Sequence, residues 1–489
     1  MPHSSADPHH DRRWLILGVI GIAQLLVVLD VTIVNIALPS AQQDLGFSDD
    51  ARQWVITAYA LAFGSLLLLG GRIADLFGRK WMFVTGLLGF AGASALGGAA
   101  QSFGLLVGAR ALQGVFAALL APAALSLLAA TFTDPGERAK AFGVFGAIAG
   151  AGGAFGLLLG GALTEVLNWR WCLYVSILFA VPAAIAGTRL LHHVPAPNRP
   201  RLDVPGTLAA SSGLFSLVFG LARAETDGWG DPVTLGFLVA SAVLLAGFVA
   251  LQRRAAHPLL PLRVVVDRNR GGSYLAIATA GAGIFGVFLF LTFYLQRTKG
   301  LSPLETGLAF LPMNFAIIAT ATIVSTRLLA RTGPRPLVPL GMMLGALGMA
   351  LLTRIGVDTG YASHVLPSLI LIGVGFGLII APSIATATLG VPPHDLGVAS
   401  AMVNTSQQIG GSIGTALLST LAASATTDFI AGRGPAPDVL RQAAVEGYTT
   451  AFWVAAGIFA IGALVCGSLL RPGTRPAIVH GAAEPAVAA

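Results

Sequence analysis

Long apolar stretches separated by short polar segments dominate the sequence. A helix that crosses the hydrocarbon core of a bilayer needs about 20 mostly apolar residues, and fourteen stretches of this kind occur. The pattern therefore predicts fourteen membrane-spanning helices. Their expected ranges are 14–38, 52–70, 81–100, 103–130, 139–164, 170–190, 204–223, 232–252, 271–296, 304–328, 335–356, 364–390, 396–423 and 448–470.

The composition leads to the same class of protein. Charged residues make up 10% of the chain, apolar residues 55%, and the mean hydropathy is +0.79. A soluble protein carries about 25% charged residues, so this chain cannot cover a soluble surface. The net charge of +7 comes from basic residues in short loops, a pattern typical of the cytoplasmic side. We therefore expect a multi-pass protein of the cell membrane with both termini cytoplasmic, the lipid bilayer as its surroundings and no nucleic-acid partner.

An internal repeat divides the expected helices into two sets. The loop after the second helix contains Arg72 and Gly78, and the loop after the tenth contains Arg327 and Gly333 at the same spacing. Helices 1–6 and 9–14 then correspond, which is an architecture of transporters with a substrate site near the membrane midplane. The expected segments are an N-terminal tail (1–13), a six-helix bundle (14–190), a linker with two inserted helices (191–268), a second six-helix bundle (269–470) and a C-terminal tail (471–489).

Several motifs resemble those of the major facilitator superfamily. The loop at 71–80 reads GRIADLFGRK and is similar to the signature loop of that superfamily, while RALQG at 110–114 resembles its helix-4 motif. The segment LDVTIVNIALP at 29–39 resembles the helix-1 motif of its fourteen-helix drug:proton antiporters. Further similar motifs are NWRW at 168–171, HPLLPL at 257–262 and SPLETG at 302–307. The resemblance covers nearly the whole chain and implies an all-α fold of two six-helix bundles plus two inserted helices.

Asp30 and Arg110 are the candidate proton-coupling residues, because each is a charge inside an apolar stretch. A charged side chain at a helix centre costs about 2.5–3.5 kcal/mol on insertion scales, so such residues are functional candidates. Burial disfavours the charged form of a carboxyl group, which suits a group that binds and releases protons. The resemblance implies that Arg110 influences this protonation. A structural hydrogen bond for Asp30, and a static contact with a carbonyl for Arg110, are the alternatives.

The resemblance also implies that the 71–80 loop acts as a latch between the two bundles during alternating access. The alternative is that its basic residues only set the topology. The repeat has Ala330 where the first copy has an acid, so such a latch is expected to be asymmetric. The candidate latch residues are Gly71, Arg72, Asp75, Gly78, Arg79 and Lys80.

Glycines recur along the fifth expected helix, where small residues allow close helix packing. Their pattern resembles the antiporter motif of the superfamily, although Leu157 stands where that motif has proline. Ordinary tight packing explains the same glycines without any antiport. The candidate packing residues are Gly152, Gly156, Gly160 and Gly161.

Uncharged amide side chains within the apolar stretches are candidates for the substrate cavity, because they can hydrogen-bond a ligand. They can equally join two helices. The candidates are Asn35, Gln113, Asn314, Asn404, Gln407 and Gln408.

These features indicate transport rather than catalysis. The sequence has no glycine-rich phosphate loop, no nucleophile arrangement and no spacing typical of metal ligands. We expect that the protein needs no cofactor and that the proton gradient supplies its energy. The expected function is proton-coupled efflux of small lipophilic compounds such as drugs, antibiotics or dyes by alternating access. The alternatives are an exporter with a narrow range of metabolites or antibiotics, and a channel or receptor without coupling.

Overall fold

The computed structural model describes residues 12–48, 51–132, 135–191, 203–255, 258–389, 391, 396–431, 433–434 and 436–471. The described residues form helices and connecting segments, without a strand. The tails predicted at 1–13 and 471–489 lie almost entirely outside them.

The described part of the chain forms fourteen long helices, as the apolar pattern predicts. Thirteen contain a described window that is long and apolar enough to cross a membrane, and in α5 the described apolar part is the shorter 155–166. The long helices are α1 (Arg13–Leu45), α2 (Gln53–Phe77), α3 (Arg79–Gly98), α4 (Phe103–Thr131), α5 (Pro135–Val166), α6 (Trp171–Leu190), α7 (Val204–Thr226), α8 (Pro232–Arg254), α10 (Arg268–Phe293), α11 (Pro303–Ile323), α13 (Pro334–Leu352), α14 (Leu366–Thr388), α15 (Leu396–Ala431) and α16 (Pro437–Leu469).

Short helical pieces lie at the ends of the long ones. Two π-helical turns directly continue α10 and α11, and a third leads into α14. They are η2 (Tyr294–Thr298), η3 (Val324–Leu328) and η4 (Tyr361–Val365), together with the short helices α9 (Leu262–Val266) and α12 (Leu329–Thr332).

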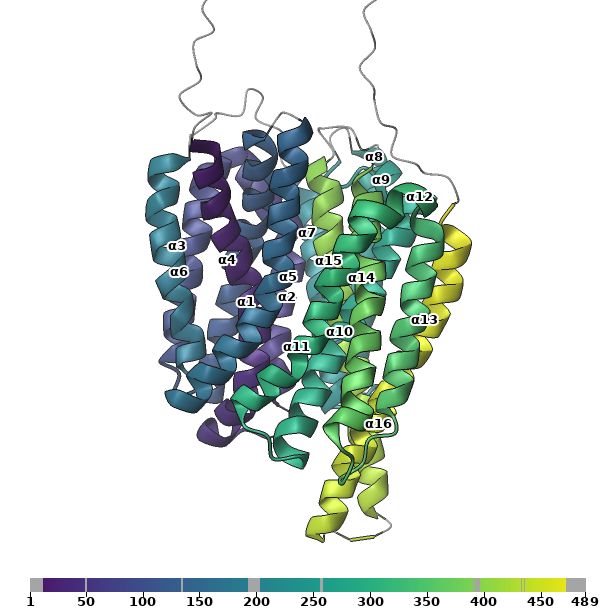
Figure 1. Cartoon of the computed structure of the whole chain (residues 1–489). Coiled ribbons are helices and arrows are strands. Elements are labelled where there is room, and N and C mark those ends of the chain that lie inside the picture. Colours follow the sequence, from purple (N-terminus) through teal and green to yellow (C-terminus); the bar gives the residue numbers. More distant parts are fainter. Residues whose placement is uncertain are drawn as a thin grey trace, which may run out of the picture.

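The helices pack as two groups that stand side by side (Figure 1). Helices α1–α6 contact one another, and α10–α16 do the same. The groups meet mainly where α5 packs on α11 and α2 packs on α15, and α7 contacts both α2 and α15. Helix α1 begins and α16 ends at the same end of the bundle (Figure 1); we call it the terminal end and the opposite one the distal end.

Several helices extend beyond the predicted apolar ranges. Helix α1 continues to Leu45 rather than 38, α15 continues to Ala431 rather than 423, and α16 begins at Pro437 rather than 448. The extra turns of α15 and α16 form a hairpin that projects from the distal end (Figure 1). Thr426 joins its two arms, since its hydroxyl donates to the carbonyl oxygen of Ala443 at 3.2 Å.

Candidate functional site

The two charges predicted inside the membrane form an ion pair. Arg110 on α4 donates from Nη1 to Oδ2 of Asp30 on α1 over 2.6 Å. The side chain of Asp30 is 0% exposed and that of Arg110 is 2% exposed. An isolated charge in such surroundings is strongly unfavourable, so each residue supplies the compensation that the other needs. The structure thus answers a question that the sequence leaves open, whether these two residues touch.

Gln113 extends the pair into a network of buried polar groups. It lies three residues after Arg110, on the same face of α4. Its amide nitrogen donates to Oδ1 of Asp30 at 3.0 Å and to the hydroxyl of Ser94 on α3 at 2.8 Å. Its amide oxygen accepts from Arg110 at 2.8 Å. Both carboxylate oxygens of Asp30 therefore accept a hydrogen bond from α4.

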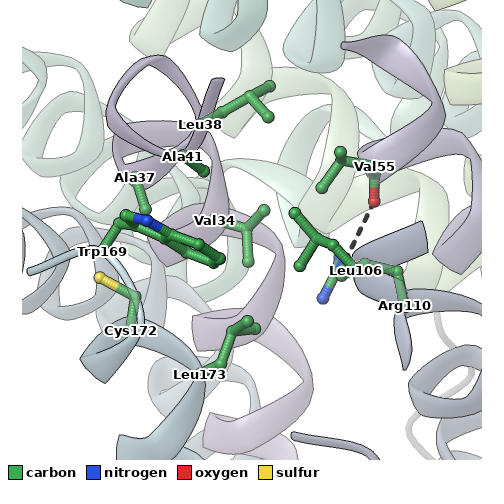
Figure 2. Close-up of a pocket in the computed structure, with 10 residues that line it drawn as sticks. All are labelled: Val34, Ala37, Leu38, Ala41, Val55, Leu106, Arg110, Trp169, Cys172 and Leu173. Atoms are coloured by element: carbon green, nitrogen blue, oxygen red, sulfur yellow. Dashed lines mark hydrogen bonds between the residues drawn. The ribbon is translucent and has the colours of Figure 1, made fainter. Parts of the chain in front are cut away.

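Arg110 has two further partners, both on α2. Its Nε donates to the carbonyl oxygen of Val55 at 3.1 Å (Figure 2), and its guanidinium lies 4.7 Å from the ring centroid of Tyr59, within the range of a cation–π interaction. The guanidinium therefore keeps favourable contacts if Asp30 becomes neutral. The arrangement is suited to a carboxyl group that changes its protonation state while its cation stays in place.

A small cavity adjoins Arg110, and Figure 2 shows the residues that line it. Its volume is about 10 Å³, enough for about one water molecule. The lining is almost entirely apolar and includes Leu106, Trp169 and Cys172. Such a space is far smaller than the roughly 300–1,000 Å³ of a typical small-molecule site, so it is no candidate for the substrate.

The predicted packing glycines of α5 face two different helices. A Cβ atom at Gly156 would lie 2.0 Å from Oγ1 of Thr32 on α1, and Gly152 and Gly160 face the same helix. Gly161 faces α11 instead, where a Cβ atom would lie 2.6 Å from the Cα of Leu304. Gly152, Gly156 and Gly160 therefore pack within the α1–α6 group, and Gly161 packs against the opposite group.

The predicted amide residues do not gather around one described cavity. Asn35 donates to the carbonyl oxygen of Val31 in its own helix at 2.7 Å, and Asn314 donates to that of Phe310 at 3.1 Å. The side chain of Gln408 on α15 packs close to Gly64 on α2. Gln113 joins the Asp30 network, as described above. The remaining two candidates, Asn404 and Gln407, are half-buried on α15.

The predicted latch loop is described only in part. Gly78 connects α2 and α3 with a φ of 96°, and Nζ of Lys80 donates to the carbonyl oxygen of Thr188 in α6 at 2.8 Å. This contact stays within the α1–α6 group. Gly71 lies near Pro122 of α4, also in that group. Arg72 is half-buried and Arg79 exposed, and the side chain of Asp75 lies outside the described residues.

Contacts between the two groups at the distal end were not predicted from the sequence. Arg297 of η2 donates to Oε1 of Gln42 on α1 at 2.8 Å. The guanidinium groups of Arg52 and Arg297 both contact the Phe293 ring, at 4.0 Å and 5.2 Å from its centroid. Arg297 also lines an open crevice of about 440 Å³. The contacts hold α1 and α2 against α10 at this end of the bundle.

A single sequence does not identify the residues that surround the Asp30–Arg110 pair. Ser94 and Tyr59 are polar interruptions in apolar stretches, which is a signal, but many other serines and tyrosines share it. Among the described residues, no group of three or more His, Cys, Asp or Glu side chains is arranged to hold a metal ion.

Comparisons with known proteins place the chain among transporters. The family model described as Major Facilitator Superfamily matches residues 20–415. The chain is 52% identical over 476 residues to the puromycin resistance protein of Streptomyces alboniger, covering 97% of this chain and 94% of that protein. It is 38% identical over 410 residues to the cephamycin export protein of Amycolatopsis lactamdurans, covering 83% and 84%. Among solved structures, an auto-inhibited peptide transporter of the POT family superposes with a TM-score of 0.68 at 19% identity, covering 94% and 96%.

Proposed function

The chain belongs to the Major Facilitator Superfamily, and from this membership we propose that it is a membrane transporter that exports antibiotic-type small molecules in exchange for protons. The relatives in the comparison are named for antibiotic resistance and antibiotic export, which supports the direction of transport and the substrate class. A transporter of this superfamily is not an enzyme, and its reaction is a movement of intact molecules across the bilayer.

One structural observation carries the coupling part of the proposal, namely the buried Asp30–Arg110 pair. Asp30 binds a proton from one side of the membrane and releases it to the other as the two helix groups rock. In the charged state both oxygens of its carboxylate are held by Arg110 and Gln113. In the neutral state Arg110 keeps the carbonyl of Val55 and the Tyr59 ring. Protonation of Asp30 removes the counter-ion of the buried guanidinium, which costs free energy, and the two remaining contacts of Arg110 offset part of that cost.

The asymmetry of basic residues supports an orientation with both termini in the cytoplasm. In this orientation the terminal end of the bundle faces the cytoplasm and the distal end faces outward. The proposal also includes the cell membrane as the location and the proton gradient as the energy source. It assigns no role to a cofactor.

A narrow substrate range is the second candidate. It is favoured by the names of the two relatives quoted above, since each refers to one antibiotic. A panel that contains puromycin, a cephamycin and an unrelated lipophilic dye separates the two: export of puromycin alone supports a narrow range, and export of all three supports the broad one.

The decisive experiment is transport into inverted membrane vesicles with an imposed pH gradient. We expect the wild-type protein to accumulate puromycin when the lumen is acidic, and Asp30→Asn to lose this accumulation at unchanged abundance. Asp44→Asn is the matched control, because Asp44 lies on the same helix and also pairs with an arginine, Arg170, but its side chain is 48% exposed. Full gradient-driven transport by Asp30→Asn would contradict proton coupling through this residue.

A further inference from the structure

Trp169 is the buried tryptophan of the NWRW motif at 168–171, to which the proposed function gives no role. The motif joins α5 to α6 at the distal end of the bundle. Connecting segments usually run exposed over a protein surface, and Trp171 is indeed 45% exposed. The side chain of Trp169 is only 4% exposed. It lines the small cavity beside Arg110, so it points into the α1–α6 group.

Several contacts hold the Trp169 ring in place. Its Nε1 donates to Oδ2 of Asp44, near the end of α1, at 3.0 Å. Arg170 pairs with the same carboxylate, and its guanidinium lies 4.5 Å from the Trp169 ring centroid. Arg170 also donates to the carbonyl oxygen of Ala100, between α3 and α4, at 2.8 Å. An asparagine at position 44 keeps an acceptor for Trp169, so the control variant of the vesicle experiment retains this arrangement.

The cavity between Trp169 and Arg110 is unfavourable for water. Seven of its ten lining residues are aliphatic. Two of its polar groups are already bonded, since Sγ of Cys172 donates to the carbonyl oxygen of Gly160 at 3.5 Å and Nε of Arg110 donates to that of Val55. A buried water molecule typically makes about three hydrogen bonds, and apolar cavities stay dry. The lining therefore opposes a chain of water molecules that would conduct protons.

Arg110 adds an electrostatic barrier to this apolar one. The lining includes Arg110 but not Asp30, and Figure 2 shows Trp169 and Arg110 on opposite sides, with Val34 and Leu106 between them. A proton that crossed the cavity would meet the guanidinium, which contacts the Asp30 carboxylate at 2.6 Å. A fixed arginine repels protons in selective pores, and apolar constrictions close pores by excluding water. Both barriers lie on one route from the distal end to Asp30.

We propose that Trp169, Leu106 and Arg110 form a proton seal inside the α1–α6 group. Asp30 then exchanges protons with the distal side only through the space between the two helix groups, when they part there. The inference rests on the proposed function for its role in the cycle. Without the seal, Asp30 would bind a proton from the distal side and release it at the terminal side without moving a substrate, and the gradient would be lost.

A proton-leak measurement tests the seal without any substrate. The purified full-length protein is placed in liposomes that contain a pH-sensitive dye, with potassium and valinomycin to remove the voltage, and the outside is acidified. We expect Leu106→Asn, which places an amide in the lining, to speed internal acidification at least about fivefold, because a polar lining admits water. Leu106→Met, which is apolar and of similar volume, should match the wild type. If Leu106→Asn does not fold, Leu173→Asn in the same lining carries the test.

A double variant shows whether the leak passes through Asp30. Adding Asp30→Asn to Leu106→Asn removes the carboxyl group that relays the proton, so the acidification rate should return to that of the wild type. A leak that persists in the double variant would overturn the proposal, and so would a Leu106→Asn protein as tight as the wild type. Either result stands apart from the transport function, because the vesicle experiment on puromycin and Asp30→Asn measures export separately.

Cys172 reports on Trp169 as the outer part of the seal. In a Cys466→Ala background, a small charged methanethiosulfonate reagent is added to the protein in lipid nanodiscs, and its attachment to Cys172 is followed by mass spectrometry. We expect Trp169→Ala to speed this reaction at least about tenfold, because the reactivity of a thiol depends on its access to the reagent. Trp171→Ala is the matched control, since it removes the exposed tryptophan of the same motif, and Cys172 should stay protected. Equal rates in the two variants would refute the seal at Trp169.

Discussion

Gly78 and Gly333, the two glycines of the sequence repeat, adopt the same unusual backbone region. Their φ angles are 96° and 70°, and each glycine stands between two helices, α2 and α3 in one case and α12 and α13 in the other. A positive φ together with an extended ψ, 128° at Gly78 and −179° at Gly333, costs about 1–3 kcal/mol for a residue with a Cβ atom. The repeat therefore preserves a sharp helix-to-helix connection in both copies, even though the acid of the first loop is missing from the second.

We predict that Gly78→Ala lowers the maximal transport rate more than the apparent substrate affinity. The added Cβ strains the connection by about 1–3 kcal/mol, and the loop lies at a bundle end, far from Asp30. Initial rates over a range of substrate concentrations provide the measurement. Gly92→Ala on α3 is the control, since a Cβ atom there meets no heavy atom within 4 Å, and its kinetics should match the wild type. A changed affinity at an unchanged rate would contradict the latch hypothesis.

The charged residues of the site could be predicted from sequence, but their surroundings could not. Asp30 and Arg110 stand out because charges are rare in apolar stretches. Val55 contributes only its backbone carbonyl, and no side-chain pattern marks such a position. Asn35 is a polar residue in an apolar stretch, as Gln113 is, yet its side chain donates to a carbonyl of its own helix. A polar side chain in a membrane helix needs a hydrogen-bond partner. The sequence identifies the side chain, but only the packing of the helices determines which partner it has.

At the scale of helices, α5 makes close contacts on two sides. Gly156 lies against Thr32 of α1, and Gly161 lies against Leu304 of α11. Leu157, which replaces the proline of the resembling motif, keeps its backbone N–H, so the helix does not lose a hydrogen bond at this position. Its carbonyl oxygen would lie 2.6 Å from a Cβ atom at Gly307 on α11. Close backbone contact between the two groups is thus achieved without the proline.

We predict that Gly156→Val destabilises the protein by about 1–3 kcal/mol, the usual cost of overpacking a close contact. The thermal midpoint of the detergent-solubilised protein should fall, as followed by fluorescence-detected size exclusion after heating. Gly108→Val on α4 serves as the control, because no heavy atom lies within 4 Å of a Cβ atom there. Equal midpoints for both variants would show that the α1–α5 contact relaxes more easily than its distances indicate.

Helix existence was predictable from the apolar stretches, whereas helix ends were not. The stretch at 14–38 marks the part of α1 that needs a bilayer, and the helix continues through Gln42 and Asp44 to Gly46, whose left-handed φ of 67° ends it. Hydropathy reports the solvent around a helix rather than the point where its hydrogen bonding stops. The same reason explains the longer α15 and α16.

At the scale of the whole molecule, the buried charge is balanced. Among the described residues that are fully buried, Asp30 is the only acid and Arg110 the only base. A dication in a low-dielectric site needs compensating negative charge, and a single carboxylate that already holds a guanidinium supplies little. We therefore expect neutral or singly charged lipophilic compounds to be preferred over dications.

We predict that matched dyes are exported in the order neutral, monocation, dication when a membrane voltage is present. One proton moving inward down about 150 mV releases about 3.5 kcal/mol, which supports a gradient of a few hundredfold for a neutral substrate, since about 1.4 kcal/mol is tenfold. For exchange of one proton against a monocation the voltage contribution cancels, and for a dication it opposes export. Vesicles with separately clamped pH and voltage provide the measurement. Faster export of the dication against the voltage would require a second acidic group or more protons per cycle.

The hairpin of α15 and α16 also matters for imaging the protein. A transporter enclosed in a detergent micelle or nanodisc presents few features by which single particles can be aligned. Helix α15 has 36 residues, or about 54 Å at 1.5 Å per residue, so it outreaches a hydrocarbon core of about 30 Å. The two arms of the hairpin are joined by the hydrogen bond from Thr426 to Ala443 and by the close approach of Gly447 to Thr426. An antibody fragment raised against this projection would therefore stand rigidly on the particle and serve as a fiducial mark for electron cryomicroscopy.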